Sequence, residues 1–314
     1  MQTELIRLNT KFTMNGEPLQ FENLYSLLDD DENFTMICRD MALANGSSRV
    51  SSFEVRERFK WIIGAFHSVD YEKLSVRAVY YRVVSLYGQP KTEKFYGHIQ
   101  TATSLMRDYG LLPFDKISDG SRSLYTSTVH DDKESFMSEM ADTYKKNMWQ
   151  DSEVRVVIVV EKMAMVDVLM PICSKYGIAI LPSRGYNSKT AWYELTDRHV
   201  EGTILHLLLL TDYDTDGLEM GTGGLKAIMQ HGYLGKMRLE RIGLNPEQIS
   251  EMNLPTRQDK KDPLMRACEL DAMTPSQARD LVEKEVLRFV DLASFERLEM
   301  LEEEEKAGLR LLQW

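Results

Sequence analysis

The stretch ILHLLLLTDYDTDG, residues 204–217, constrains the fold of this chain more than any other feature. Six of its first seven residues are apolar, and three aspartates at alternate positions follow the run. A continuous apolar run of this length is typical of a strand in a parallel sheet that helices cover on both faces. In such sheets, ligand-binding groups collect beyond the carboxyl ends of the strands. The stretch therefore predicts a buried strand followed directly by a polar site.

A second run of the same kind, VRVVIVV at 154–160, comes earlier in the chain, and helical and strand-like segments alternate around both runs. We expect helices at 162–177 and 218–232, and further strands at 178–183 and 236–244. Strands that alternate with helices predict a doubly wound parallel sheet. The sequence therefore predicts an α/β domain over residues 151–314, which ends in a helical, acidic tail.

The preceding part of the chain has a different character. Residues 51–130 hold three helical patterns, of which the second and third end at Gly88 and Gly110, and then an extended stretch. They carry eleven Lys or Arg against eight Asp or Glu, although the formal net charge of the whole chain is −11. Because local charge decides nucleic-acid binding, the acidic average does not exclude it. This pattern predicts a winged-helix-like, mainly helical module at 51–150, after an N-terminal extension and linker at 1–50.

Four carboxylates follow the two apolar runs. Glu161 comes directly after the first run, and Asp212 and Asp214 come after the second, with Asp216 two residues further on. Alternate residues of an extended chain point the same way, so Asp212 and Asp214 are expected to face one site. Converging carboxylates repel one another unless a divalent cation lies between them, and hard oxygen ligands suit Mg²⁺. The pattern therefore predicts a magnesium site.

Three other interpretations of the aspartates were weighed. An EF-hand loop beginning at Asp212 needs a glutamate at its twelfth position, which is Gly223, and a helix before the loop. An aspartyl phosphatase also begins with an apolar strand and Asp-x-Asp, but usually continues with Thr or Val where Asp216 stands. The third interpretation is a simple cluster at the end of a strand, in which Asp216 caps the next helix.

Two motifs carry a resemblance to a known family. Glu161 after one buried strand and DYD after another resemble the Toprim metal-binding fold of topoisomerases, primases and some nucleases. The stretch SVRAVYYRVVSLYG, residues 75–88, resembles the Arg-x-x-Tyr-Tyr motif of the type IIB topoisomerase VI A subunit and of its relative, the meiotic double-strand-break transesterase. Four shorter stretches resemble small standalone relatives of that subunit, or fit the end of its Toprim lobe: 109–123, 183–192, 241–255 and 268–282.

The resemblance covers roughly residues 50 to 290 and implies a role for each residue of the motifs. It implies that Tyr81 is the nucleophile and that Arg77 is the motif arginine, while Glu161, Asp212 and Asp214 hold Mg²⁺. Asp216 adds a charge that is suited to a second metal. Arg122, Arg184 and Gly185 are candidate contacts to DNA.

The implied reaction is Mg²⁺-dependent cleavage of both strands of DNA by a homodimer, through a 5′-phosphotyrosyl link. No Walker A motif is present in the sequence, so the passage of one duplex through another would need a separate ATPase subunit of the GHKL type.

The chemistry agrees with the residue types. A phenol with a pKa of about 10 is a weak nucleophile at neutral pH and needs help from a base or a nearby cation. Arg77 lies one helical turn before Tyr81 and is placed to stabilise the phenolate or to hold the phosphate. Glu161 is placed to pass a proton to the leaving 3′ oxygen.

Two other functions stay open from the sequence. One is a Toprim nuclease that hydrolyses DNA without the tyrosine, and the other is a non-catalytic DNA-binding module. In either case Tyr80 and Tyr81 would simply pack in the core of an amphipathic helix.

The sequence also predicts where the protein works. Cys38, Cys173 and Cys268 are too few and too scattered for a disulfide framework or a zinc site, which predicts a reducing cytoplasm. No apolar run approaches the length of a membrane span, so we expect no membrane contact.

Overall fold

The computed structural model describes residues 13–14, 17–18, 20–29, 31–44, 52–108, 110–118, 128–183, 202–220 and 236–311. The chain divides into two compact units, and neither is continuous in sequence. The first unit combines residues 1–119 with 249–258 and 266–276, and the second combines 120–248, 259–265 and 277–314. The boundary predicted near residue 150 therefore falls inside the second unit.

The first unit is mainly helical, as predicted. Its N-terminal part holds β1 (Thr13–Met14), β2 (Glu17–Pro18), the 3-10 helix η1 (Phe21–Leu27) and α1 (Asp31–Ala44). The predicted helices follow as α2 (Phe53–His67), α3 (Val76–Tyr87) and α4 (Glu93–Asp108), which pack on one another. The extended stretch after them contains η3 (Phe114–Lys116) and β4 (Ile117–Ser118), and β4 pairs in parallel with β3 (Leu74–Ser75).

The ends of these helices have identifiable causes. The hydroxyls of Ser52 and Ser75 accept hydrogen bonds from the backbone N–H groups of Val55 and Ala78, which caps α2 and α3 at their N-termini. Gly88 ends α3 in the left-handed conformation, with φ 60°, which glycine adopts without steric cost.

The first unit also contains two segments from the second half of the sequence. They hold β9 (Arg257–Gln258), its antiparallel partner β10 (Arg266–Ala267) and the 3-10 helix η4 (Leu270–Ala272), which packs on α3. The resemblance assigned residues 241–255 and 268–282 to the end of a Toprim lobe; the structure divides both stretches, with 249–255 and 268–276 in the first unit and 241–248 and 277–282 in the second. Two helices cross the boundaries between units: α9 (Pro246–Glu251) and α10 (Pro275–Val286).

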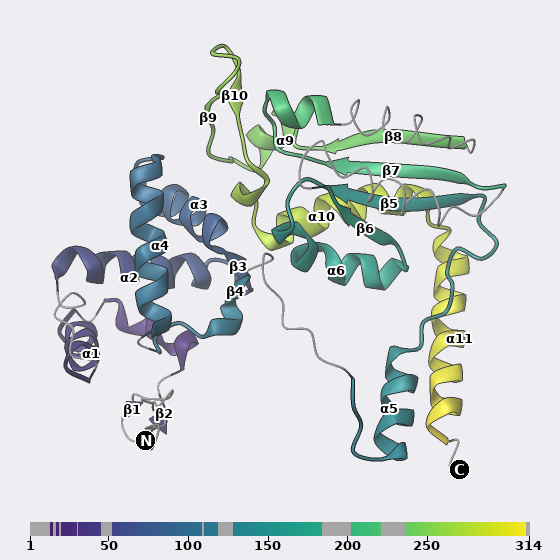
Figure 1. The fold of residues 1–314 in the computed structure, drawn as a ribbon, viewed down its shortest axis with the longest axis horizontal. Helices are drawn as coiled ribbons and strands as arrows, with labels where there is room; N and C mark the ends of the chain where they lie inside the picture. Colours follow the sequence, from purple (N-terminus) through teal and green to yellow (C-terminus); the bar gives the residue numbers. More distant parts are fainter. Residues whose placement is uncertain are drawn as a thin grey trace, which may run out of the picture. The chain divides into compact units, whose positions relative to one another are not determined.

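The second unit is built on a parallel four-stranded sheet, which confirms the predicted α/β class (Figure 1). The strands are β5 (Val154–Val160), β6 (Ala179–Pro182), β7 (Ile204–Leu210) and β8 (Lys236–Gly243), in the spatial order β6-β5-β7-β8. All four lie within the ranges predicted from the sequence. Helix α6 (Ala164–Tyr176) connects β5 to β6, and a further helix begins at residue 215 after β7.

Both faces of this sheet are covered, which explains why β5 and β7 are apolar at nearly every position. One face forms a cluster of buried side chains: Val157, Val159, Leu205, Leu207, Leu209 and Met220. On the other face the ring of His206 lies 4.7 Å from that of Phe289, in the 3-10 helix η5 (Leu287–Phe289). Burial of a strand on two sides removes the polar alternation that an exposed face would require.

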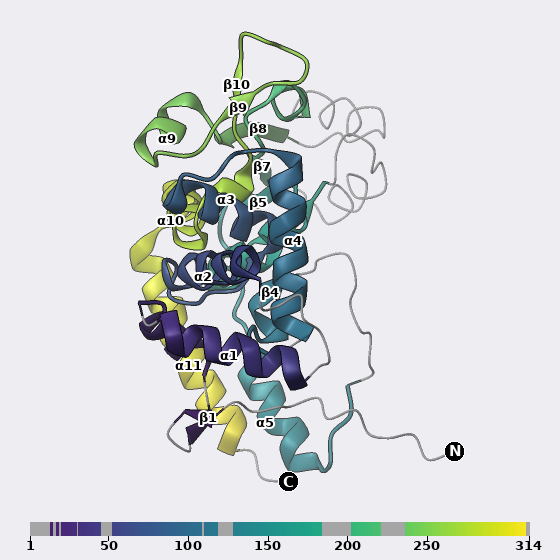
Figure 2. The same cartoon turned by 90° about the vertical axis from the view of Figure 1, so that its left-hand side faces the viewer.

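Two further helices of the second unit lie side by side, α5 (Lys133–Thr143) and α11 (Leu292–Leu311) (Figures 1 and 2). Glu302, which is 2% exposed, joins them through hydrogen bonds from Lys145 Nζ (2.9 Å), the backbone N–H of Lys146 (2.8 Å) and Lys306 Nζ (2.8 Å). These contacts hold the pKa of Glu302 at about 2, although burial by itself raises it. In the described part of the chain, none of the helices has the length and apolar character needed to cross a bilayer.

Candidate functional site

The order of the strands creates one position where a ligand site is expected. The chain leaves β5 toward β6 on one side, and leaves β7 toward β8 on the other, so the direction of winding reverses between β5 and β7. In open parallel sheets, ligands bind beyond the carboxyl ends of the strands at this switch point. Glu161 follows β5 and Asp212 follows β7, so the structure brings two of the four predicted metal ligands to the expected place.

These two carboxylates are tied together through the backbone. The backbone N–H of Glu161 donates to the carbonyl of Leu210 at 3.2 Å, which extends the pairing of β5 with β7. The backbone N–H of Asp212 donates to Glu161 Oε2 at 3.0 Å. Asp212 is 5% exposed, so its charge is largely withdrawn from water.

Two cations that the sequence analysis did not single out neutralise part of this charge. Lys162 Nζ lies 3.0 Å from Asp212 Oδ2. Arg241, on β8, donates from Nη2 to the carbonyl of Asp212 at 3.1 Å and from Nε to the hydroxyl of Thr211 at 2.9 Å. The pKa of Glu161 is raised to about 7 by burial and by the nearby charge of Asp212, against the opposing effects of the N–H of Asp212 and of Lys162.

The other two aspartates make different contacts. Asp214 Oδ1 accepts a hydrogen bond from the backbone N–H of Gly217 at 2.8 Å, so Asp214 caps the helix that begins at residue 215. The cap that the sequence suggested for Asp216 is therefore made by Asp214. Asp216 is exposed and forms an ion pair with Lys261.

A fifth carboxylate, that of Asp259, lies beside this motif, and the sequence did not predict its position there. Asp259 is 7% exposed, and its Oδ1 accepts hydrogen bonds at 2.8 Å from the hydroxyl of Thr215 and from the backbone N–H groups of Lys261 and Asp262. The N–H of Asp262, followed by the Thr215 hydroxyl and the N–H of Lys261, lowers its pKa despite burial. The hydrogen bond between Thr215 and Asp259 joins residues 44 positions apart, so it cannot be predicted from a local sequence pattern.

The donor set fits Mg²⁺ in its chemistry. Glu161 and Asp212 offer hard oxygen ligands at one edge of the sheet; burial and then the charge of Asp212 raise the pKa of Glu161, and a bound cation would favour its ionised form. Asp214 would become a third ligand on leaving its cap. Among the described residues, no three His, Cys, Asp or Glu side chains are already gathered closely enough to hold a metal.

The predicted tyrosine lies in the first unit. Tyr81 is 2% exposed and Tyr80 is 3% exposed, so both rings of the motif are buried. Lys91 Nζ lies 4.7 Å from the centre of the Tyr81 ring. Arg77 donates from Nε and Nη2 to the carboxylate of Glu269, at 3.2 and 3.4 Å, and its guanidinium carbon lies 4.5 Å from the ring of Tyr96. Three candidate DNA contacts, Arg122, Arg184 and Gly185, lie outside the described residues.

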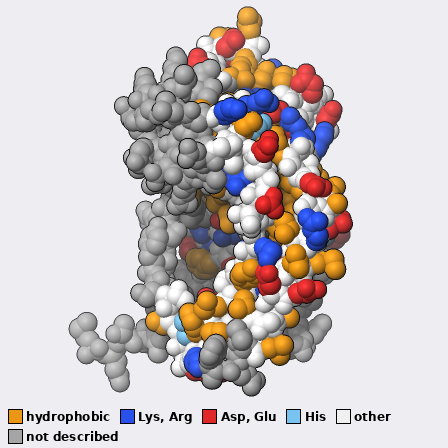
Figure 3. All heavy atoms as spheres, turned by 90° about the vertical axis from the view of Figure 1, so that its right-hand side faces the viewer, with side chains coloured by type: hydrophobic (Ala, Val, Ile, Leu, Met, Phe, Trp, Pro, Cys, Tyr) orange, Lys and Arg blue, Asp and Glu red, His pale blue; other side chains and the backbone are white. Residues whose placement is uncertain are grey.

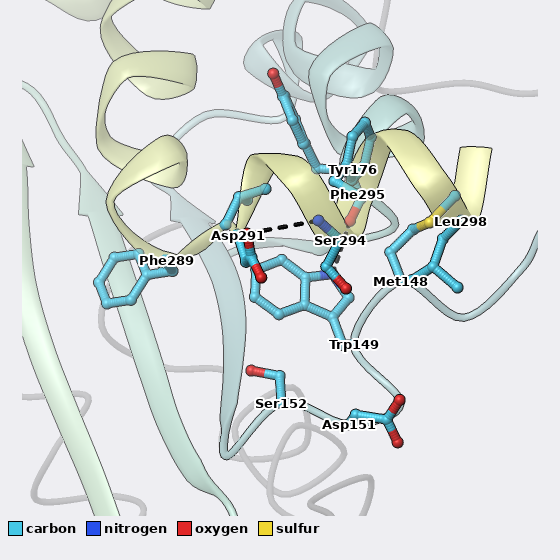
Figure 4. A pocket seen from close by; sticks show the side chains of 11 residues that line it. Met148, Trp149, Asp151, Ser152, Tyr176, Phe289, Asp291, Ser294, Phe295 and Leu298 are labelled. Atoms are coloured by element: carbon cyan, nitrogen blue, oxygen red, sulfur yellow. Dashed lines mark hydrogen bonds between the residues drawn. The ribbon is translucent and has the colours of Figure 1, made fainter. Parts of the chain in front are cut away.

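One face of the molecule and one cavity of the second unit were compared with the predicted site residues. On the face drawn in Figure 3, basic and acidic side chains are interspersed among the described residues. A cavity of about 300 Å³ in the second unit lies at the start of α11 (Figure 4). Its polar groups are engaged locally: Trp149 Nε1 donates to the carbonyl of Tyr176 at 2.7 Å, and Asp291 accepts from the N–H of Ser294 at 3.5 Å. It contains none of the predicted site residues.

Comparisons of this chain with protein-family models, with curated proteins and with solved structures find no match.

Proposed function

We propose that this chain is a Mg²⁺-dependent enzyme that cleaves double-stranded DNA by tyrosine transesterification. In this proposal the first unit is a winged-helix-like tyrosine module and the second is a Toprim-like metal-binding domain. The observation that carries the proposal is the meeting of Glu161 and Asp212 at the switch point of a parallel sheet. Further support comes from Arg77 and Tyr81, one turn apart on α3.

In the proposed reaction the phenolic oxygen of Tyr81 attacks phosphorus and loses its proton to water, and the bond from phosphorus to the 3′ oxygen breaks. Glu161 would pass a proton from water to that leaving oxygen. Arg77 holds the phosphate through its planar fork. Mg²⁺ held by Glu161, Asp212 and Asp214, with Asp216 as a further ligand, would stabilise negative charge on the phosphate.

The proposal includes partners. Cleavage of both strands requires two copies of the tyrosine, so the active form would be a homodimer. Strand passage would need a separate GHKL-type ATPase subunit.

One observation favours a second candidate function. Because Tyr81 is only 2% exposed, its hydroxyl can reach a phosphate only after the first unit rearranges. A nuclease that uses the carboxylate site alone and activates water would need no such change. This alternative shares Glu161 and Asp212 with the first and differs in its dependence on Tyr81.

A plasmid-cleavage experiment separates the two functions. Purified protein is incubated with supercoiled plasmid and Mg²⁺, stopped with detergent, and run on a gel with and without proteinase K. For a transesterase, linear DNA carries bound protein, and Tyr81→Phe lowers its yield by at least about a thousandfold, because the nucleophile is gone. Tyr80→Phe, a change to the neighbouring buried ring, is the matched control and retains cleavage.

The other outcomes are equally informative. Linear or nicked DNA that is free of protein and survives Tyr81→Phe would support the nuclease. Asp212→Asn abolishes cleavage in both cases. Cleavage that persists in Asp212→Asn would contradict both functions.

A further inference from the structure

The carboxylate of Glu269 is held by two arginines. Glu269 lies just before η4, is 7% exposed, and accepts hydrogen bonds from Nε and Nη2 of Arg77 at 3.2 and 3.4 Å. Arg257 Nε lies 3.5 Å from Glu269 Oε1. All three residues belong to the first unit, although 192 positions separate Arg77 from Glu269 in the sequence.

Further cations surround this carboxylate. The pKa of Lys91 is lowered to about 8 by burial and, to a smaller extent, by Arg257 and Arg266, whereas Cys268 and Glu269 raise it. Lys91 Nζ donates to the carbonyl of Pro255 at 2.8 Å, and Arg266 donates to the hydroxyl of Thr256 at 2.9 and 3.1 Å. Arg77, Lys91, Arg257 and Arg266 are called the basic cluster below.

Two acidic side chains contact Arg77 of the basic cluster. Glu269 faces it from inside, and Glu93 lies 3.5 Å from Arg77 on the exposed side. The side chains of Arg77 and Arg257 are 28% and 25% exposed, so both are partly open to solvent. Glu269 is the more deeply buried partner, with a side chain that is 9% exposed.

A planar guanidinium recognises a carboxylate and a phosphate with the same fork of N–H donors. A carboxylate that receives two such donors from one arginine and lies beside a second arginine thus occupies the position a phosphate oxygen would take. Arg77 lies one helical turn from Tyr81 on α3, and Lys91 lies over the Tyr81 ring.

We propose that the basic cluster is a binding site for a phosphate of the DNA backbone, in which the Glu269 carboxylate stands in for that phosphate until DNA binds. The choice of DNA as the ligand rests on the proposed function. The occupied site leaves Arg77 paired and Tyr81 buried, so the described first unit is the form that precedes DNA binding.

Binding can be measured without cleavage, as the fluorescence anisotropy of a labelled DNA duplex in EDTA over a series of salt concentrations. Glu269→Gln removes the competing charge and keeps the shape of the side chain. We expect this variant to bind at least about threefold more tightly than the wild type, with a salt dependence steeper by about one released counterion.

Asp271→Asn is the matched control, because it removes the same charge from the same segment. The Asp271 carboxylate accepts a hydrogen bond at 2.8 Å from the Ser75 hydroxyl, which is a neutral donor. We expect its affinity for DNA to equal that of the wild type. Equal affinities of Glu269→Gln and Asp271→Asn, or weaker binding by Glu269→Gln, would overturn the proposal.

A second variant tests the site if Glu269→Gln does not fold. Arg257→Gln should weaken DNA binding about threefold, whereas Arg58→Gln, on α2 and paired with Glu54 at 3.4 Å, should not. An unchanged affinity in Arg257→Gln, or no DNA binding by the wild type, overturns the proposal.

These outcomes are separate from those of the cleavage assay. If Glu269→Gln binds DNA more tightly but the wild type does not cleave plasmid, the proposed enzymatic function is wrong and the phosphate site stands. If the wild type cleaves plasmid but Glu269→Gln does not bind DNA more tightly, the phosphate site is wrong and the enzymatic function stands.

Discussion

At the scale of single residues, Glu161 combines burial with a negative neighbour, and this makes a prediction about pH. Its pKa rises from 4.5 to about 7 in the folded protein. Between these values the folded state binds more protons than the unfolded state, so the free energy of unfolding falls as pH rises through this window. The stability that the protonated form contributes is fully present below pH 4.5 and is lost by pH 7.

We therefore expect Glu161→Gln to lose less stability than the wild type when pH is raised from 4.5 to 7, by at most about 1.4 kcal/mol per pH unit. The measurement is urea unfolding at several pH values. Glu247→Gln, a change at an exposed position of α9, is the control and should follow the wild type. If the free energy of unfolding depends on pH in the same way for Glu161→Gln and the wild type, folding does not raise the pKa of this carboxyl.

The residue scale also shows what the sequence could and could not predict. The positions of Glu161 and Asp212 follow from where two apolar runs end, and the structure brings both residues together. The cap made by Asp214 was not predicted, because an aspartate before a helix and an aspartate at a metal have the same local sequence. The pairing of Arg77 with Glu269 has no local signal at all, since its partners are 192 positions apart.

At the scale of elements, the turn from β7 into the next helix depends on Gly217. A Cβ at this position would lie 2.2 Å from the backbone oxygen of Asp212 and 3.3 Å from Asp214 Oδ1. Backbone cannot yield to such a contact as a side chain can, so the turn must move. Only glycine allows the helix to begin so close to the strand and keeps both aspartates at the edge of the sheet.

We expect Gly217→Ala to lower the free energy of unfolding by about 1–3 kcal/mol, as overpacked substitutions do, and to abolish plasmid cleavage by displacing Asp212. The control is Gly97→Ala on α4, where a Cβ would meet nothing within 4 Å. That change should stabilise the protein by about 0.5–1 kcal/mol, because alanine loses less backbone entropy in a helix. Thermal unfolding of both variants gives the comparison, and equal stabilities would contradict the close contact at Gly217.

At the scale of the whole molecule, the chain builds two units from interleaved segments. The sheet of the second unit was predictable because its two central strands, β5 and β7, are buried along most of their length and are therefore continuously apolar. The contribution of residues 249–258 and 266–276 to the first unit was not predictable. Their strands β9 and β10 have two residues each, which is too few for any periodicity. The second segment contacts the start of α3 through Glu269 and Asp271, which are distant from it in sequence.

This interleaving predicts that a fragment of residues 1–119 is incomplete. It lacks Glu269 for Arg77, Asp271 for Ser75, and the buried side chain of Leu270. A synthetic peptide of residues 249–276 should bind the fragment and raise its thermal midpoint, in proportion to the logarithm of the peptide concentration, by about 5 °C or more at saturation. The same peptide with Leu270→Asp should have no effect, because a charge replaces a fully buried apolar group. If both peptides leave the midpoint unchanged, α3 does not depend on these segments, and the tyrosine module is a continuous domain as the sequence alone suggested.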